Sequence, residues 1–150
     1  METREVQIVR LFNEAINRHD VESLCSFMAP DHAFIDSGGG VTTGVETMRK
    51  GWKDFFEMFP DYRNEMLGFL QDGNLVMAYG RASGTYNGKR GLVPENRITM
   101  PAAWKAVIRN SLILEWQVYA DWSEGLKICE EDDKAGQPLN DGSAEGHCLP

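Results

Sequence analysis

The hydrophobic pattern of this chain changes near Pro60, and this change limits the folds that the sequence can adopt. Before this point apolar residues recur every three or four positions, which is typical of amphipathic helices. After it apolar and polar residues alternate, which is typical of strands. Helices that come first and strands that come last predict an α+β fold.

Three helices are expected before Pro60. The first covers residues 4–17, where apolar residues line one face. Asp20 is placed to cap a shorter second helix. Thr43 and Glu46 have the spacing of a capping box, which predicts that a third helix begins near Val45.

Five extended segments are expected, at residues 32–36, 62–70, 75–86, 97–108 and 112–122. With the three helices packed on one face, they predict a strongly curved mixed or antiparallel sheet that forms a cone around an apolar pocket. Residues 1–122 are expected to be a single domain. Residues 123–150 hold few large apolar side chains and many acids, so we expect an acidic tail that is flexible apart from one helical turn near residues 126–131.

The charge of the chain argues against two classes of partner. Its 23 acidic and 15 basic residues give a formal net charge of −8, which repels phosphate backbones and anionic lipid headgroups. We therefore expect neither nucleic acid nor a membrane as a partner. The first residues lack the basic stretch and apolar run of a secretory signal, which favours a cytoplasmic location.

Neither a metal nor a cofactor is expected. Cys25, Cys129 and Cys148 show no CxxC spacing, and the three histidines are scattered along the chain, whereas a zinc site needs a close group of ligands. An odd number of cysteines without a secretory signal suggests reduced thiols.

Three motifs mark the rest of the chain: Phe-Pro-Asp at residues 59–61, Gly-Thr at residues 84–85, and a last strand with Ile113, Glu115, Trp116 and Asp121. With the order of the segments, they make residues 4–122 resemble the nuclear transport factor 2-like superfamily. The resemblance is greatest to its SnoaL-like polyketide cyclases and ketosteroid isomerase-type branch. It implies a pocket for a small hydrophobic molecule, no cofactor, and a homodimer formed through the sheet face away from the helices.

Two aspartates and a histidine are the candidate catalytic residues. Asp121 matches the acid/base aspartate of the resembling cyclases, and an apolar pocket would raise the pKa of its carboxyl; the alternative is a cap at the strand end. Asp36 resembles the general base of ketosteroid isomerases, although an Asp before Ser-Gly-Gly is also an ordinary turn residue. His32 shares a strand face with Asp36 and is either a proton relay or a polar edge residue.

Aromatic side chains are the candidate pocket lining, although aromatic residues at these spacings also build ordinary cores. The expected substrate-binding residues are Trp52, Phe55, Tyr79, Trp104, Trp116 and Tyr119.

The leading hypothesis is a small-molecule-binding protein that acts as a cofactor-independent lyase, isomerase or cyclase. In it Asp121, helped by Asp36, moves a proton next to the carbonyl of a hydrophobic substrate. The alternative is a non-catalytic ligand-binding or dimerisation module, because the segment PAAWKAV lacks the polar residue that the family carries there. The fold alone does not decide between them.

Overall fold

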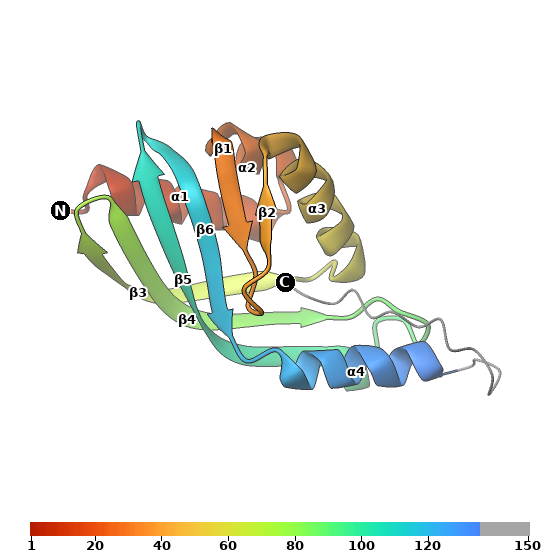
Figure 1. Ribbon diagram of the computed structural model, residues 1–150. Coiled ribbons are helices and arrows are strands. Elements are labelled where there is room, and N and C mark those ends of the chain that lie inside the picture. The colour runs from red at the N-terminus through yellow and green to blue at the C-terminus, as the bar shows by residue number, and fades with distance from the viewer. Residues whose placement is uncertain (136–150) are drawn as a thin grey trace.

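Residues 1–135 are described by a computed structural model, in which a layer of helices packs on a curved sheet (Figure 1). The N-terminal helices are α1 (Arg4–Arg18), α2 (Val21–Ser26) and α3 (Val45–Met58). The strands are β1 (Met28–Ile35), β2 (Val41–Thr43), β3 (Arg63–Asp72), β4 (Leu75–Thr85), β5 (Arg97–Arg109) and β6 (Leu112–Ala120). The predicted α+β class is confirmed. Within these residues no helix has the length and apolar character that a membrane span requires.

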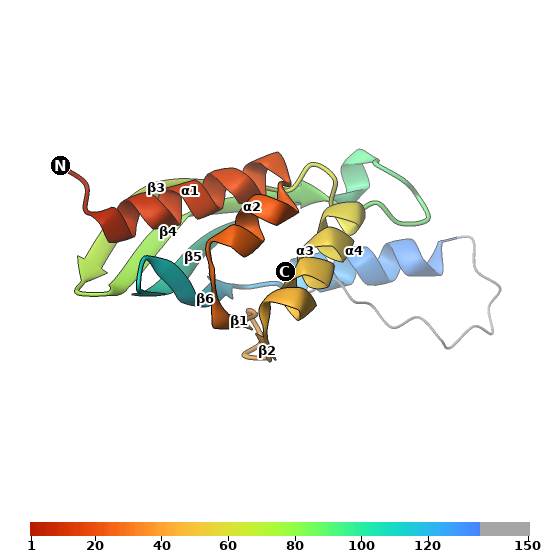
Figure 2. The ribbon, with the colours of Figure 1, turned by 90° about the horizontal axis from the view of Figure 1, so that it is seen from above.

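The six strands lie in the order β2-β1-β6-β5-β4-β3. β1 and β6 are parallel and the other neighbouring pairs are antiparallel, so the sheet is mixed. Because β2 and β3 form opposite edges, the sheet is curved but not closed into a barrel. Seen from above, α1, α2 and α3 lie over the same face (Figure 2). The helices therefore define an inner face of the sheet.

The helix starts follow local signals in the sequence, with one exception. Thr3 and Asp20 each accept a backbone hydrogen bond at the start of α1 and of α2, and the Asp20 cap was predicted. At α3 the Thr43 cap does not form, because Gly44 occupies the N-cap position with a φ of 97° and no side-chain hydrogen bond. Glycine adopts such an angle without strain.

Aromatic side chains fill the space between the helices and the sheet. Trp104 on β5 and Trp116 on β6 are each 1% exposed. The ring centroid of Phe12 on α1 lies 4.7 Å from that of Trp116, and Trp52 on α3 packs edge-on against Phe12 at 6.4 Å. Such pairs contribute about 1 kcal/mol each beyond the area that they bury. The alternation along the last strands therefore reflects one face that buries large rings under α1 and α3.

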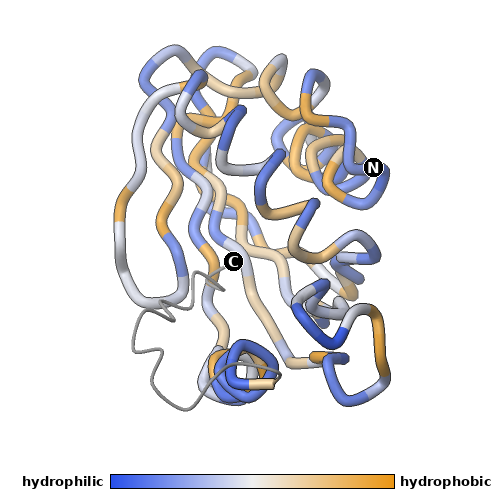
Figure 3. The backbone as a smooth tube through the Cα atoms, turned by 90° about the vertical axis from the view of Figure 1, so that its right-hand side faces the viewer, coloured by the Kyte–Doolittle hydropathy of each residue, from blue (hydrophilic) through white to orange (hydrophobic). Residues whose placement is uncertain are grey.

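A fourth helix, α4 (Ser123–Lys134), lies in the segment that we expected to be a flexible tail. It packs against β5 and against the short 3-10 helix η1 (Pro94–Asn96). The helix is largely hydrophilic, as its colour shows in Figure 3, where it is seen end-on at the bottom. The sequence predicted only one helical turn of it, near residues 126–131. The expected tail is therefore wrong for α4, and residues 136–150 lie outside the described part.

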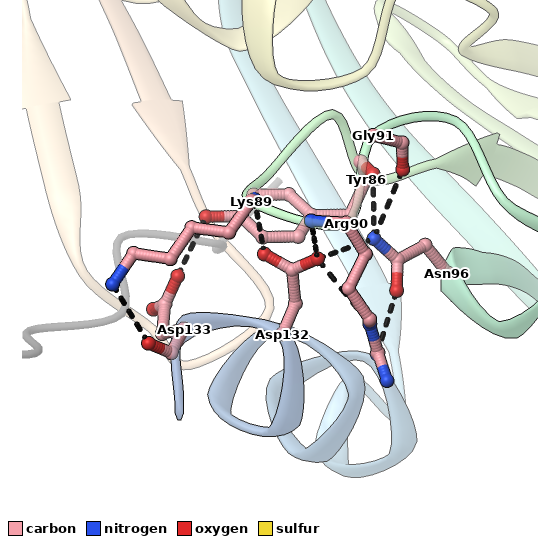
Figure 4. A network of polar contacts seen from close by, with 7 residues as sticks. All are labelled: Tyr86, Lys89, Arg90, Gly91, Asn96, Asp132 and Asp133. Carbon is pink, nitrogen blue, oxygen red and sulfur yellow. Dashed lines mark hydrogen bonds and ion pairs between the residues drawn. The ribbon is translucent and has the colours of Figure 1, made fainter. Parts of the chain in front are cut away.

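Asp132 holds α4 against the loop between β4 and β5 (Figure 4). Its carboxylate is fully buried and accepts hydrogen bonds from the backbone N–H groups of Lys89 and Arg90, at 2.6 and 2.8 Å. It also accepts one from the Asn96 side chain at 2.8 Å. The close approach requires Gly88, because a Cβ atom there would lie 2.0 Å from Asp132 Oδ2. We call these contacts of Asp132 with Lys89, Arg90 and Asn96 the Asp132 latch.

The latch also lowers the pKa of Asp132. Burial by itself raises the pKa of this carboxyl, but hydrogen bonds from Asn96, Arg90 and Lys89 and the charge of Arg90 hold the pKa below its ordinary value of 3.8. Unfolding removes these contacts. The latch therefore stabilises the fold fully above the unfolded-state pKa, and this stability is lost as the pH falls through the lower folded-state pKa.

Replacing Asp132 by Asn should lower the free energy of unfolding by about 3 kcal/mol at neutral pH, because charge-assisted hydrogen bonds to buried groups are lost. The variant should also show a weaker acid dependence below about pH 4. Urea unfolding at a series of pH values measures both effects. Glu131→Gln, an exposed position on the same helix, is the control. Equal stability of Asp132→Asn and the unmodified protein would contradict the latch.

The expectation of reduced thiols is confirmed at one of the two cysteines in the described part of the chain. Cys25 is a buried free thiol. Cys129, which is buried on α4, is disulfide-bonded, so the expectation is wrong for this residue. Cys148 lies outside the described residues.

Candidate functional site

A cavity of about 180 Å³ lies between α3 and the β1–β2 hairpin. Its wall is mostly apolar, with one carboxylate and one hydroxyl group. The lining residues are Phe34, Asp36, Thr42, Met48, Gly51, Trp52 and Phe55. The volume is below the roughly 300 Å³ of the smallest pockets for drug-sized ligands and close to the about 150 Å³ of a dry cavity that holds benzene. The cavity is therefore sized for a compound of one ring.

Asp36 brings the carboxylate to this wall. It follows β1 at the turn into β2 and is half-buried. Its Oδ1 atom accepts hydrogen bonds from the backbone N–H groups of Gly38 and Gly40, each at 2.9 Å. Among residues 1–135, no hydrogen bond reaches Oδ2. Asp36 is thus a turn residue, as one interpretation of the sequence held, and the turn also fixes its carboxylate at the cavity.

His32 is fully buried on β1 and is not part of the cavity wall. Its Nδ1 atom lies 2.7 Å from the carbonyl oxygen of Ile113 on β6. A carbonyl can only accept, so Nδ1 carries the proton and donates it, while Nε2 has no partner within the described chain. Burial lowers the pKa of His32, and the hydrogen bond to Ile113 offsets this in part. The imidazole is therefore neutral near pH 7 and ties β1 to β6.

Asp121 lies outside the cavity. It is exposed at the start of α4, where its Oδ1 atom accepts hydrogen bonds from the hydroxyl and the backbone N–H of Ser123 at 2.5 and 3.0 Å. These two hydrogen bonds hold the pKa of Asp121 below its ordinary value. The expectation of an apolar pocket that raises this pKa is wrong, and the alternative of a cap at the strand end is the one that the chain uses.

The six aromatic residues expected to bind substrate divide into three groups, of which the first lines the cavity. Trp52 and Phe55 project from α3 into its wall. Trp104 and Trp116 are buried in the core beneath the helices and do not line the cavity.

The third group lies on the opposite face of the sheet. Tyr79 is 54% exposed and Tyr119 is 46% exposed. In the register both pair with Ala103, so the three residues share one face, which is the outer face. On β6 the predicted alternation holds only in part, because a register shift buries both Ile113 and Trp116. The side of a strand that faces the helices depends on the whole sheet.

Four residues of the wall were not predicted from the sequence: Phe34, Thr42, Met48 and Gly51. Phe34 shares a strand face with Asp36, so the alternation of β1 would have found it. Met48 lies one helical turn before Trp52, so the helical spacing of α3 would have found it as well. Thr42, on the three-residue strand β2, gave no such signal.

Within residues 1–135 no three His, Cys, Asp or Glu side chains gather closely enough to hold a metal ion.

The SnoaL-like domain matches residues 9–116, and the chain belongs to this family. The match ends before α4. No functionally curated protein shows significant sequence similarity to the chain.

Solved structures share this fold at low sequence identity. A candidate SnoaL-like polyketide cyclase from Shewanella denitrificans OS-217 is 14% identical, with a TM-score of 0.75 over 87% of this chain and 99% of the other. A protein with a ketosteroid isomerase-like fold from Catenulispora acidiphila DSM 44928, solved with trimethylamine, is 21% identical, with a TM-score of 0.70 over 80% and 89%. TerC, co-crystallised with polyporic acid, is 17% identical, with a TM-score of 0.67 over 79% and 92%.

His32 should make the protein less stable below about pH 6.5 than above it. Its folded-state pKa is lowered from 6.5, so as the pH falls the unfolded chain binds a proton first and stability declines until the folded-state pKa is reached. His32→Gln keeps a donor for the Ile113 carbonyl and should flatten this part of the urea-unfolding profile. His19→Gln is the comparison. An NMR spectrum that shows His32 protonated at about pH 6 would contradict the assignment.

Proposed function

We propose that the chain binds a small hydrophobic carbonyl compound in the cavity between α3 and the β1–β2 hairpin, and that Asp36 moves a proton next to the carbonyl. The observation that carries this proposal is a fixed carboxylate that shares a cavity wall with Phe34, Trp52 and Phe55. Apolar cavities with a few placed polar groups are the usual form of small-molecule sites. Membership of the SnoaL-like family supports the same kind of ligand.

The reaction that this arrangement favours is proton transfer through an enolate. The carboxylate of Asp36 takes a proton from the carbon beside the carbonyl, the electron pair of that bond moves to the carbonyl oxygen, and the proton returns to the same or another carbon. The aromatic walls lower the polarity around the bound compound, which strengthens its electrostatic contacts. This chemistry is of the isomerase, cyclase or lyase kind and involves no cofactor.

Acetophenone has one ring and exchangeable methyl protons beside its carbonyl, so it tests both parts of the proposal. In deuterium oxide the protein should accelerate methyl proton exchange, followed by proton NMR. Asp36→Asn should reduce the accelerated rate by about 100-fold or more, the usual contribution of a positioned base. Asp121→Asn is the control and should keep the rate. Full exchange activity in Asp36→Asn would show that this carboxylate is not the base.

A non-catalytic ligand-binding module is the second candidate. Two backbone N–H groups already hold Asp36 Oδ1, as they do at an ordinary turn residue that has no catalytic role. Acetophenone should then change the fluorescence of Trp52 without accelerating exchange. Trp52→Phe removes this signal and identifies its source.

We also propose a homodimer through the outer face of the sheet. Tyr79 and Tyr119 are exposed there, and so is Leu70, which pairs with Met77. Burying these side chains against a second copy would stabilise a dimer. Light scattering should give the mass of two chains, and Tyr79→Glu with Tyr119→Glu should give one. Leu11→Glu, an exposed apolar position on α1, is the control and should leave the mass unchanged.

A cytoplasmic location stays a prediction, and so does the absence of nucleic acid and membrane partners. The net charge of −8 supports the absence of nucleic acid and membrane partners. The disulfide at Cys129 counts against a cytoplasmic location, because disulfides are rare in the reducing cytosol.

A further inference from the structure

The segment after β6 closes one end of the space between helices and sheet. Trp122, at the N-cap of α4, is 5% exposed, and its ring packs edge-on against Phe59 with 5.9 Å between centroids. It borders an apolar seam that has no free volume for a water molecule. The other seam residues are Phe59, Tyr62, Ser83, Gly84, Ile98 and Met100. The SnoaL-like match ends at residue 116, so Trp122 and α4 lie beyond it.

One side chain separates this seam from the cavity of the proposed site. Phe55 lines the cavity. Its ring centroid lies 5.1 Å from that of Phe59 and 4.7 Å from that of Tyr62, both of which line the seam. A rotation of Phe55 would therefore join the two spaces, provided that Trp122 leaves room.

Two observations indicate that Trp122 can leave. The indole Nε1 donor of Trp122 is buried without an acceptor among the described residues. In the packed position this N–H group therefore makes no hydrogen bond, which costs free energy. The helix that carries it is largely hydrophilic (Figure 3) and is held by the polar contacts of the Asp132 latch (Figure 4). The apolar contacts of this segment with the core come from Trp122, Leu126, Ile128 and Cys129. Elements with few contacts to the rest of the fold are those that open locally in native proteins.

We propose that α4 is a stopper that sets the depth of the ligand pocket. While the latch holds α4, Trp122 fills the deep end and the cavity takes one ring. When α4 moves away with Trp122, the cavity and the seam join and the pocket takes a compound of two fused rings. This inference rests on the proposed function of the cavity.

Calorimetric titration with phenol and with 2-naphthol tests the stopper. Asp132→Asn weakens the latch without making a hole. It should tighten 2-naphthol binding by about fivefold or more, because the open state is more populated and less binding energy is spent on opening. Phenol affinity should stay the same, and Glu131→Gln should leave both affinities unchanged.

A second pair of variants keeps the test decisive if Asp132→Asn does not fold. Trp122→Ala removes the stopper itself and should also tighten 2-naphthol binding, whereas Trp122→Phe keeps a ring in place and should behave as the unmodified protein. If phenol binds but 2-naphthol affinity is the same in every variant, the stopper is wrong and the proposed binding site stands.

Failure of the proposed function gives a different result. If phenol does not bind the unmodified protein, the site between α3 and the β1–β2 hairpin is wrong. Hydrogen exchange then tests whether α4 opens when the latch is weakened. Asp132→Asn should speed exchange of the α4 amides by about tenfold or more relative to Glu131→Gln. Unchanged exchange in α4 would overturn the stopper.

Discussion

The packing of α1 and α3 against the inner face of the sheet is the contact on which the rest of the structure depends. Phe12 from α1 meets both Trp116 of the sheet and Trp52 of α3, so one ring joins the two layers. Because α3 is held in this way, Trp52 and Phe55 stand at a fixed distance from β1, and the cavity forms between them.

Carboxylates determine how the chain is arranged around this core, and each does so through hydrogen bonds with backbone groups. Asp36 accepts two in the β1–β2 turn, Asp121 accepts one before α4, and Asp132 accepts two from the loop between β4 and β5. Of the three, Asp36 also reaches the cavity. The difference in function between them therefore comes from their surroundings, since all three accept hydrogen bonds from backbone N–H groups.

The sequence predicted most of the fold because its signals are local. The helical spacing before Pro60 and the alternation after it correspond to α1, α3 and the long strands. The helix α4 could not be predicted in this way, because the partners of Asp132 lie more than 35 positions away in sequence, at Lys89, Arg90 and Asn96.

The candidate site was predicted only in part, for a related reason. Trp52 and Phe55 lie on an amphipathic helix, where the apolar side is known to face inward. Tyr79 lies on a strand whose two faces look alike in sequence, so the choice between pocket and outer face required the assembled sheet. For Asp121 the family position suggested catalysis, but a serine two residues later supplies the donors that make it a cap.

A crystal structure of the protein soaked with acetophenone tests the central claim most directly. The account predicts the phenyl ring between Phe34, Trp52 and Phe55, with the methyl carbon within hydrogen-bond-like reach of Asp36 Oδ2. Acetophenone bound elsewhere, with this cavity empty, would contradict it.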